Sequence, residues 1–389
     1  MDFELISIVA FFTLVAVLLW RDRKKIEFKH GIVIRKMQQG GKALDNLVKR
    51  RERFFRILGD IGVIAAIITA FAGTALLIIF PIFRQTPSIA PVLPTVSNYQ
   101  YPGPIVSVPI WYWLIAVFVI MATHETMHAI MTRLAGINIK NYGFIFFLVL
   151  PIGAFVDPDM KKIARLKLTQ KLRIYAAGSF GNFITALIVI ALFFSSVWIN
   201  NNMIEGVGVK FESTLEGTPA RDVNLNGIIY EIDGVSIKTQ SELRDVLNKT
   251  EPGKKIKILT TEGEFELTTI ESPYFANMSY LGIENTKTDY RYKLGVFAGR
   301  VVPDALIDSI VFWYGLLSWL FVLSLGIAIV NLLPMKPLDG GLIFEEFAKK
   351  YFGKFGKQLT KIASVFIAML LIFNLFILHL LKYLLSLVV

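Results

Sequence analysis

Uncharged apolar runs alternate with short charged segments over most of the chain. A membrane with a hydrocarbon core of about 30 Å is spanned by a helix of about 20 apolar residues. Runs of roughly this length occupy residues 5–20, 61–83, 110–136, 174–198, 309–335 and 362–381. We therefore expect a polytopic α-helical membrane protein with about six transmembrane helices.

One apolar segment, residues 142–156, does not have the pattern of a spanning helix. It is interrupted by Gly143, Pro151 and Gly153, which weaken or break helices. Two short strands joined near Pro151 fit this segment better, and they predict a re-entrant β-hairpin. Non-helical backbone at membrane depth is tolerated only where protein or a water-filled cavity satisfies its polar groups. The predicted hairpin must therefore contact one or the other.

Residues 203–304 differ from the rest, with mixed charges, β-branched runs and turn signals. The pattern predicts a strand that ends at the Asp233-Gly234 turn, and a β-hairpin within residues 254–270. A short amphipathic helix is expected from Ser241 to Leu247, with Ser241 as its N-cap. These elements predict an α+β domain inserted between the fourth and fifth spans.

The charges are segregated along the chain. Residues 21–56 contain 13 basic and 4 acidic side chains, whereas residues 205–308 contain 12 basic and 17 acidic ones. Because positive loops stay on the cytoplasmic side, we expect loops 21–56, 138–173 and 336–361 inside, the first of them helical. The N-terminus and the inserted domain are then outside. Although the net charge is +11, this segregation indicates membrane topology rather than binding of nucleic acid.

These patterns divide the chain into four predicted regions. Residues 1–109 form an N-terminal region with two spans, a basic cytoplasmic linker and a proline-rich loop. Residues 110–202 form the first part of a membrane core, and residues 305–389 form its second part. Residues 203–304 form the extracytoplasmic domain between these two parts.

The third apolar run contains the sequence His124-Glu-Thr-Met-His128, in which Glu125 follows the first histidine. On a helix, residues four apart project from one face, so both imidazoles can bind one zinc ion. Glu125 lies beside them, where it can take a proton from a water molecule. Since the chain has no cysteine, any zinc ligands must be histidines and carboxylates. Ionisable groups within a membrane span are costly, which favours a functional site over a chance match.

A second group of polar residues follows the fifth apolar run. The segment Asn331-Leu-Leu-Pro334 is followed by Leu338-Asp339-Gly340, and Asp339 can supply a third metal ligand. Together with the upstream histidine motif, this combination resembles the site-2 protease family of intramembrane metalloproteases. The resemblance covers about residues 110–380.

Further similarities to this family lie between the two motifs. Residues 153–156 resemble its re-entrant β segment, and Gly178-x-x-x-Asn182 resembles a motif of its central span. The inserted domain resembles a bacterial-type PDZ domain, which one branch of the family carries at this place. Residues 280–283 are a candidate strand for binding an extended peptide in that domain. Ser179 is a departure, since many relatives have proline there.

The resemblance implies a zinc metalloendopeptidase that holds one zinc ion per chain. The implied ligands are His124, His128 and Asp339. Glu125 would act as general base and acid, and Asn182 and Asn331 would orient the substrate or stabilise an oxyanion. The implied substrates are transmembrane proteins, cut within or near their transmembrane segments during regulated intramembrane proteolysis. The implied location is a prokaryotic cell membrane, with the PDZ-like domain outside.

Other functions stay open on the residues alone. The main alternative is a non-catalytic, PDZ-bearing membrane adaptor with a structural zinc site, but such a protein would not need Glu125. A membrane metalloprotease with glutamate as third ligand is disfavoured because no later span carries a glutamate. A zinc transporter is disfavoured because it needs a polar path, which the first, second and sixth runs hardly offer.

Overall fold

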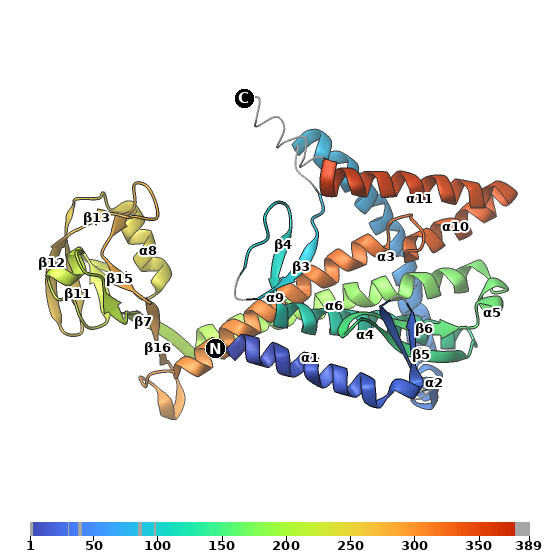
Figure 1. Cartoon of the computed structure of the whole chain (residues 1–389), viewed down its shortest axis with the longest axis horizontal. Helices are drawn as coiled ribbons and strands as arrows, with labels where there is room; N and C mark the ends of the chain where they lie inside the picture. Colours follow the sequence, from blue (N-terminus) through green and yellow to red (C-terminus); the bar gives the residue numbers. More distant parts are fainter. Residues whose placement is uncertain (1–2, 30, 38–40, 85–87, 97–98, 378–389) are drawn as a thin grey trace. The chain divides into compact units, whose positions relative to one another are not determined.

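The computed structural model describes residues 3–29, 31–37, 41–84, 88–96 and 99–377, which form two compact units (Figure 1). The first unit contains Met1–Leu192 and Tyr314–Val389, and the second contains Phe193–Trp313. The region boundaries expected from the sequence stay predictions. The predicted end of the sixth apolar run, at residue 381, lies outside the described residues.

Long apolar helices make up most of the first unit. Its helices, two of which continue into the second unit, are α1 (Phe3–Arg21), α2 (Gly41–Arg50), α3 (Glu52–Ile79), α4 (Ile110–Leu134), α5 (Met160–Ala164), α6 (Leu168–Met203), α9 (Asp304–Asn331), α10 (Asp339–Phe352) and α11 (Gly356–Ile372). Within the described residues, six helical stretches are long and apolar enough to cross a membrane, and the last of them joins α10 to α11. This arrangement fits the expected polytopic membrane protein.

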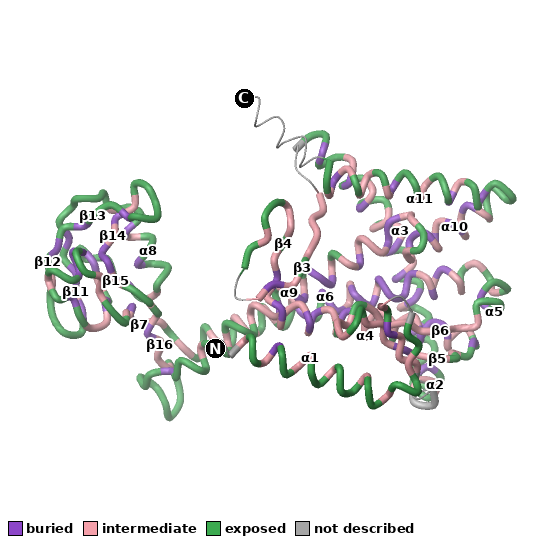
Figure 2. Tube along the Cα trace, viewed as in Figure 1, coloured by how far each residue is buried: buried purple, intermediate pink, exposed green. Residues whose placement is uncertain are grey.

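Many positions along the long helices are exposed (Figure 2), and many of these exposed residues have large apolar side chains. Phe71 on α3 is 76% exposed, and Leu187 on α6 is 68% exposed. Exposed apolar area costs about 25 cal/mol per Å² in water, so contiguous surface of this kind is suited to contact with lipid.

The first unit also contains a four-stranded antiparallel sheet in the order β1-β2-β5-β6. Its strands are β1 (Ile26–Lys29), β2 (Ile32–Met37), β5 (Ile139–Phe147) and β6 (Leu150–Pro158). The predicted hairpin is therefore present as β5 and β6. It turns at Leu148, which has φ 54°, so Pro151 lies within β6 rather than at the junction. Its depth in a membrane stays a prediction.

The expectation that residues 21–56 are helical is wrong for residues 26–29 and 32–37, which form β1 and β2. Both strands contain β-branched or aromatic residues, and Gly31 between them has φ 80°, a conformation that glycine adopts readily. Arg35 on β2 pairs with Asp22 at 2.5 Å, which holds the pKa of that carboxyl below its ordinary value. Pairing of β2 with β5 therefore overrides the local helical tendency.

Helix α2 packs against the C-terminal half of α4. Val48 of α2 is buried in a cluster with Ile130 and Met131 of α4. Asp45 accepts hydrogen bonds from the Arg133 guanidinium through both carboxylate oxygens, a geometry that fixes orientation as well as distance. This part of the basic linker thus packs against a helix of the predicted membrane core. In the proline-rich loop, β3 (Val92–Thr95) and β4 (Val106–Pro109) form a parallel pair.

The second unit is built on a six-stranded sheet in the order β12-β11-β9-β7-β16, with β10 paired to β9. Its strands are β7 (Ile204–Lys210), β9 (Ile229–Ile232), β10 (Val235–Ser236), β11 (Lys255–Thr260), β12 (Gly263–Thr268) and β16 (Lys287–Tyr292). Two short pairs form separate two-stranded sheets: β8 (Ser213–Thr214) with β15 (Ile283–Glu284), and β13 (Ile270–Glu271) with β14 (Ser279–Tyr280). Its helices are α7 (Pro219–Asp222) and α8 (Gln240–Lys249).

The local predictions for this unit are largely confirmed. Asp233 and Gly234 both have positive φ and join β9 to β10, and β11 and β12 form the expected hairpin. The predicted cap of α8 is wrong by two residues. Thr239 is the N-cap, because its hydroxyl accepts from the Glu242 amide at 3.3 Å while the Glu242 carboxylate accepts from the Lys238 amide at 2.6 Å.

Candidate metal centre

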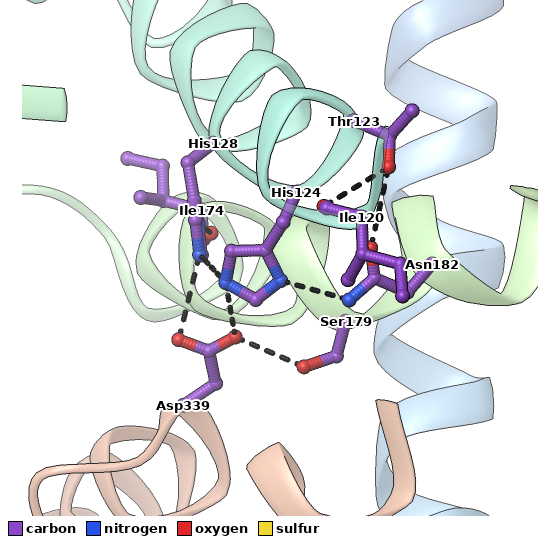
Figure 3. Close-up of polar contacts among 8 residues, drawn as sticks. All are labelled: Ile120, Thr123, His124, His128, Ile174, Ser179, Asn182 and Asp339. Atoms are coloured by element: carbon purple, nitrogen blue, oxygen red, sulfur yellow. Dashed lines mark hydrogen bonds and ion pairs between the residues drawn. The ribbon is translucent and has the colours of Figure 1, made fainter. Parts of the chain in front are cut away.

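Two histidines of α4 and one aspartate of α10 converge in the first unit (Figure 3). His124 and His128 lie one turn apart, and their Nε2 atoms are 3.1 Å from each other. The Asp339 carboxylate lies across from both, with its oxygens 3.5 Å from Nε2 of His124 and 3.4 Å from Nε2 of His128. Within the described ranges, this is the one group of three His or carboxylate side chains close enough to share a metal ion.

The spacing of these three groups fits zinc. In a tetrahedral site, zinc lies about 2.0–2.2 Å from histidine nitrogen and carboxylate oxygen, so the ligand atoms are about 3.3–3.5 Å apart. The two imidazole nitrogens are 3.1 Å apart, and each lies 3.4 or 3.5 Å from one of the two Asp339 oxygens, distances that are close to those edges. The side chains of the three residues are only 13–17% exposed, so a cation there is shielded from bulk solvent.

Gly178 of α6 leaves room in front of the two imidazoles. A Cβ atom at this position would lie 2.3 Å from Nε2 of His128 and 2.5 Å from Nε2 of His124. Any side chain here would therefore occupy the space next to the two ligand nitrogens. The absence of a side chain at Gly178 is a direct requirement of the site.

The outer atoms of two ligands are held by hydrogen bonds (Figure 3). Nδ1 of His128 lies 2.7 Å from the Ile174 carbonyl, to which it donates, and this leaves the Nε2 lone pair free for a metal. The Ser179 hydroxyl donates to Oδ2 of Asp339 at 3.0 Å. Such contacts orient metal ligands and fix the tautomer of histidine.

Asn182 contacts the outer nitrogen, Nδ1, of the other histidine, His124. Its amide lies 3.3 Å from Nδ1 of His124 and 3.3 Å from the Thr123 hydroxyl, which also donates to the Val119 carbonyl. The amide oxygen of Asn182 accepts from the Thr123 hydroxyl, and the amide nitrogen faces Nδ1 of His124 (Figure 3). Asn182 is completely buried, and this network satisfies its polar atoms.

Asp339 is placed by the break between α9 and α10. Asp339 is the first residue of α10. Glycine follows twice because the first turn of α10 lies directly on the preceding loop. A Cβ at Gly340 would lie 2.0 Å from the Leu332 carbonyl oxygen, and one at Gly341 would lie 2.4 Å from the backbone of Met335.

Glu125 borders a cavity of about 320 Å³ beside His124. Asn182 and Asn331 also line this cavity, and residues 152–154 of β6 form another wall. The backbone amide of Val156 on β6 donates a hydrogen bond to the Glu125 carboxylate. The side chains of His124, Glu125, Asn182 and Asn331 therefore line one cavity, and β6 of the predicted hairpin borders the same cavity.

The structure thus brings together all the site residues expected from the sequence: His124, Glu125, His128, Asn182, Asn331 and Asp339. Sequence reasoning missed the contact of Ser179 with Asp339 and the steric role of Gly178. The spacing of Ser179 and Asn182, which puts both on one face of a helix, was the available signal. It did not show that this face meets the histidines.

Three comparisons place the chain among known proteins. A family model described as peptidase family M50 matches residues 112–375. An uncharacterised protein of Methanocaldococcus jannaschii is 27% identical over 259 residues, which are 65% of this chain and 62% of that protein. A Clostridium perfringens protein with the provisional name zinc metalloprotease is 24% identical over 299 residues, or 60% of this chain and 85% of that protein.

Among solved structures, the PDZ domain of an SdrC-like protein from Listeria monocytogenes is similar at 25% identity and a TM-score of 0.18. The similar region covers 20% of this chain and 85% of the chain of that structure. The chain spans less than two thirds of the length of the Methanocaldococcus relative. The family model, in contrast, matches more than half of this chain, including all the site residues above. The resemblance to site-2 proteases is thereby confirmed, and the chain belongs to peptidase family M50.

Proposed function

We propose that this protein is a zinc metalloendopeptidase of the site-2 protease type, which hydrolyses peptide bonds within or near transmembrane segments. The observation that carries the proposal is the ligand triangle of His124, His128 and Asp339, with Glu125 beside it in a cavity among apolar helices. One zinc ion per chain fits this triangle. A structural zinc site needs the ligands but has no use for an adjacent carboxylate that borders a cavity.

The three ligands would hold the zinc ion, which polarises a water molecule and the substrate carbonyl when it is bound. Glu125 accepts a proton from the attacking water and delivers it to the amide nitrogen that leaves. The water oxygen bonds to the carbonyl carbon as the C–N bond breaks, and the products are a carboxylate and an amine. Asn331 orients the substrate carbonyl from the cavity wall, and Asn182 keeps the His124 ring in place.

A transmembrane helix must unwind before hydrolysis, because its peptide groups are hydrogen-bonded to each other. Strand β6 ends the sheet and borders the cavity, so its free edge supplies partners to the unwound segment. We expect substrates with glycine, asparagine or proline near the cut, since these residues lower helix stability. The hairpin of β5 and β6 would then be re-entrant.

Charge distribution supports the orientation of the protein in a prokaryotic cell membrane. The basic segments 21–56, 138–173 and 336–361 lie inside, and the N-terminus and the PDZ-like residues 203–304 lie outside. The bilayer and transmembrane proteins are its partners, and regulated intramembrane proteolysis is its setting. The PDZ-like part is suited to bind extended peptides or to filter substrates by size.

The test compares the wild-type protein with Glu125→Gln at equal zinc content, on a single-span model substrate in detergent. We expect cleavage by the wild type and a rate about 10²- to 10⁴-fold lower in the variant, with zinc retained, because proton transfer is lost. Equal cleavage by both proteins would contradict the role of Glu125. Zinc binding by both without cleavage of any substrate would favour the membrane adaptor instead.

A further inference from the structure

A second cavity of about 320 Å³ adjoins Glu125, and none of the three predicted metal ligands lines it. Among the described residues that line the two cavities, only Glu125 and Ala154 are common to both. The first cavity contains His124 and the two asparagines, whereas the second contains no histidine or asparagine. Glu125 therefore separates a polar space, next to the metal site, from a second space of different chemistry.

The free edge of β6 connects the two cavities. Gly153 borders the first cavity, Ala154 borders both, and Val156 borders the second. The amide of Val156 donates to Glu125, so this edge faces α4, and the register from Ala154 to Val156 is regular. In a regular strand, every second residue offers its N–H and C=O to the same edge. A polypeptide paired with β6 therefore runs past Glu125 from one cavity into the other.

We propose that the second cavity is a specificity subsite that accepts an apolar side chain of the substrate next to the cleaved bond. This inference rests on the proposed protease function. A strand paired with β6 places its side chains alternately on the two faces of the sheet. The substrate residue that lies just beyond Glu125, in the direction of the second cavity, then directs its side chain into that cavity.

The chemistry of the lining defines the class of side chain. Glu125 is its only charged residue within the described part of the chain, and alanine or aromatic carbons form most of the wall. Ala122 and Ala129 lie on the same face of α4 as Glu125, one turn away on either side, and their small size leaves the space open. An aliphatic or aromatic side chain is stabilised there by burial, whereas a carboxylate would be repelled by Glu125 and would lose its hydration.

Leu44 of α2 closes this subsite. It belongs to the N-terminal region that precedes the family match at residues 112–375. Its helix is held on α4 by the Asp45–Arg133 pair and by the buried side chain of Val48, which is 5% exposed. The N-terminal region thus contributes a residue that determines specificity, in addition to its two spans.

The experiment measures kcat/KM for a single-span substrate with Ala, Leu, Phe, Asp or Lys at each position that flanks the mapped cut. Wild type is compared with Leu44→Ala, which enlarges the subsite, and Leu44→Trp, which fills it. Leu47→Trp is the matched control, because Leu47 lies on the same helix but is 46% exposed and does not line the cavity. Zinc content and thermal unfolding verify that each variant is folded.

We expect wild type to prefer Leu or Phe at one flanking position. Leu44→Trp should lower kcat/KM for these residues about 10-fold relative to Ala, and Leu44→Ala should shift the preference towards Phe, since misfit of one or two carbons changes rates by about 10- to 200-fold. Leu47→Trp should behave as wild type. Unchanged preferences in both Leu44 variants, or a preference for Lys or Asp, would overturn the subsite while cleavage itself persisted. If wild type cleaves no substrate, the protease function fails, and the subsite fails with it.

Discussion

The candidate metal centre and the core of the second unit are both buried, but the first buries polar side chains and the second buries aliphatic ones. At the candidate metal centre, Ser179 and Asn182 are fully buried polar residues, and each makes a hydrogen bond with a predicted metal ligand. In the second unit, Val209, Ile229 and Ile258 are equally buried, and their cluster is entirely aliphatic. A polar atom has few acceptable partners at fixed geometry, whereas an aliphatic group needs only volume. Substitutions should therefore act on function in the first region and on stability in the second.

The largest expected effect is from Gly178→Ala. The new methyl group would lie within 2.5 Å of both ligand nitrogens, and both rings are held by outer hydrogen bonds that resist their displacement. Loss of a hydrogen bond to a metal ligand lowers metal affinity by about 10- to 100-fold, and we expect a larger fall in zinc affinity here. Metal titration of the purified protein would measure it.

The matched control for this change is Gly326→Ala. Gly326 lies in α9, and a Cβ atom there would meet nothing within 4 Å among the described residues. This variant should keep the wild-type zinc affinity and cleavage rate. If Gly178→Ala also bound zinc normally, the metal would lie elsewhere than in front of the two imidazoles.

A smaller and different effect is expected from Ile258→Ala in the second unit. Ile258 is fully buried, and removal of a buried aliphatic side chain costs about 2–5 kcal/mol of unfolding free energy. Thermal unfolding should show the loss, while zinc affinity stays that of the wild type. Ile270→Ala, at a position that is 40% exposed, should leave both quantities nearly unchanged. A fall in zinc affinity in Ile258→Ala would show that the two regions are coupled.

The smallest effect is expected from Ser179→Ala. Loss of the hydrogen bond to Asp339 should weaken zinc binding by about 10- to 100-fold, which equals about 1.4–2.8 kcal/mol. Ser324→Ala is the control, because Ser324 is also fully buried on a membrane helix, yet its hydroxyl makes no hydrogen bond within the described part of the chain. Equal zinc affinities of the two variants would mean that Ser179 does not position Asp339.

The sequence by itself determined the features that depend on neighbouring residues. The apolar runs predicted the long helices, and the four-residue spacing of His124 and His128 predicted a shared face on one of them. The alternation in residues 254–270 predicted the hairpin of β11 and β12. The motif at Asp339 predicted a third metal ligand through its resemblance to a family.

Only the tertiary structure decided which distant groups meet. Ser179 and Asp339 are 160 positions apart, and no local pattern reports that their atoms are 3.0 Å from each other. Residues 26–29 and 32–37 form strands because β2 pairs with β5, and Leu44 lines the second cavity because α2 packs on α4. Helical and strand periodicities describe which face of an element is apolar, but the partner of that face is set by packing over the whole chain.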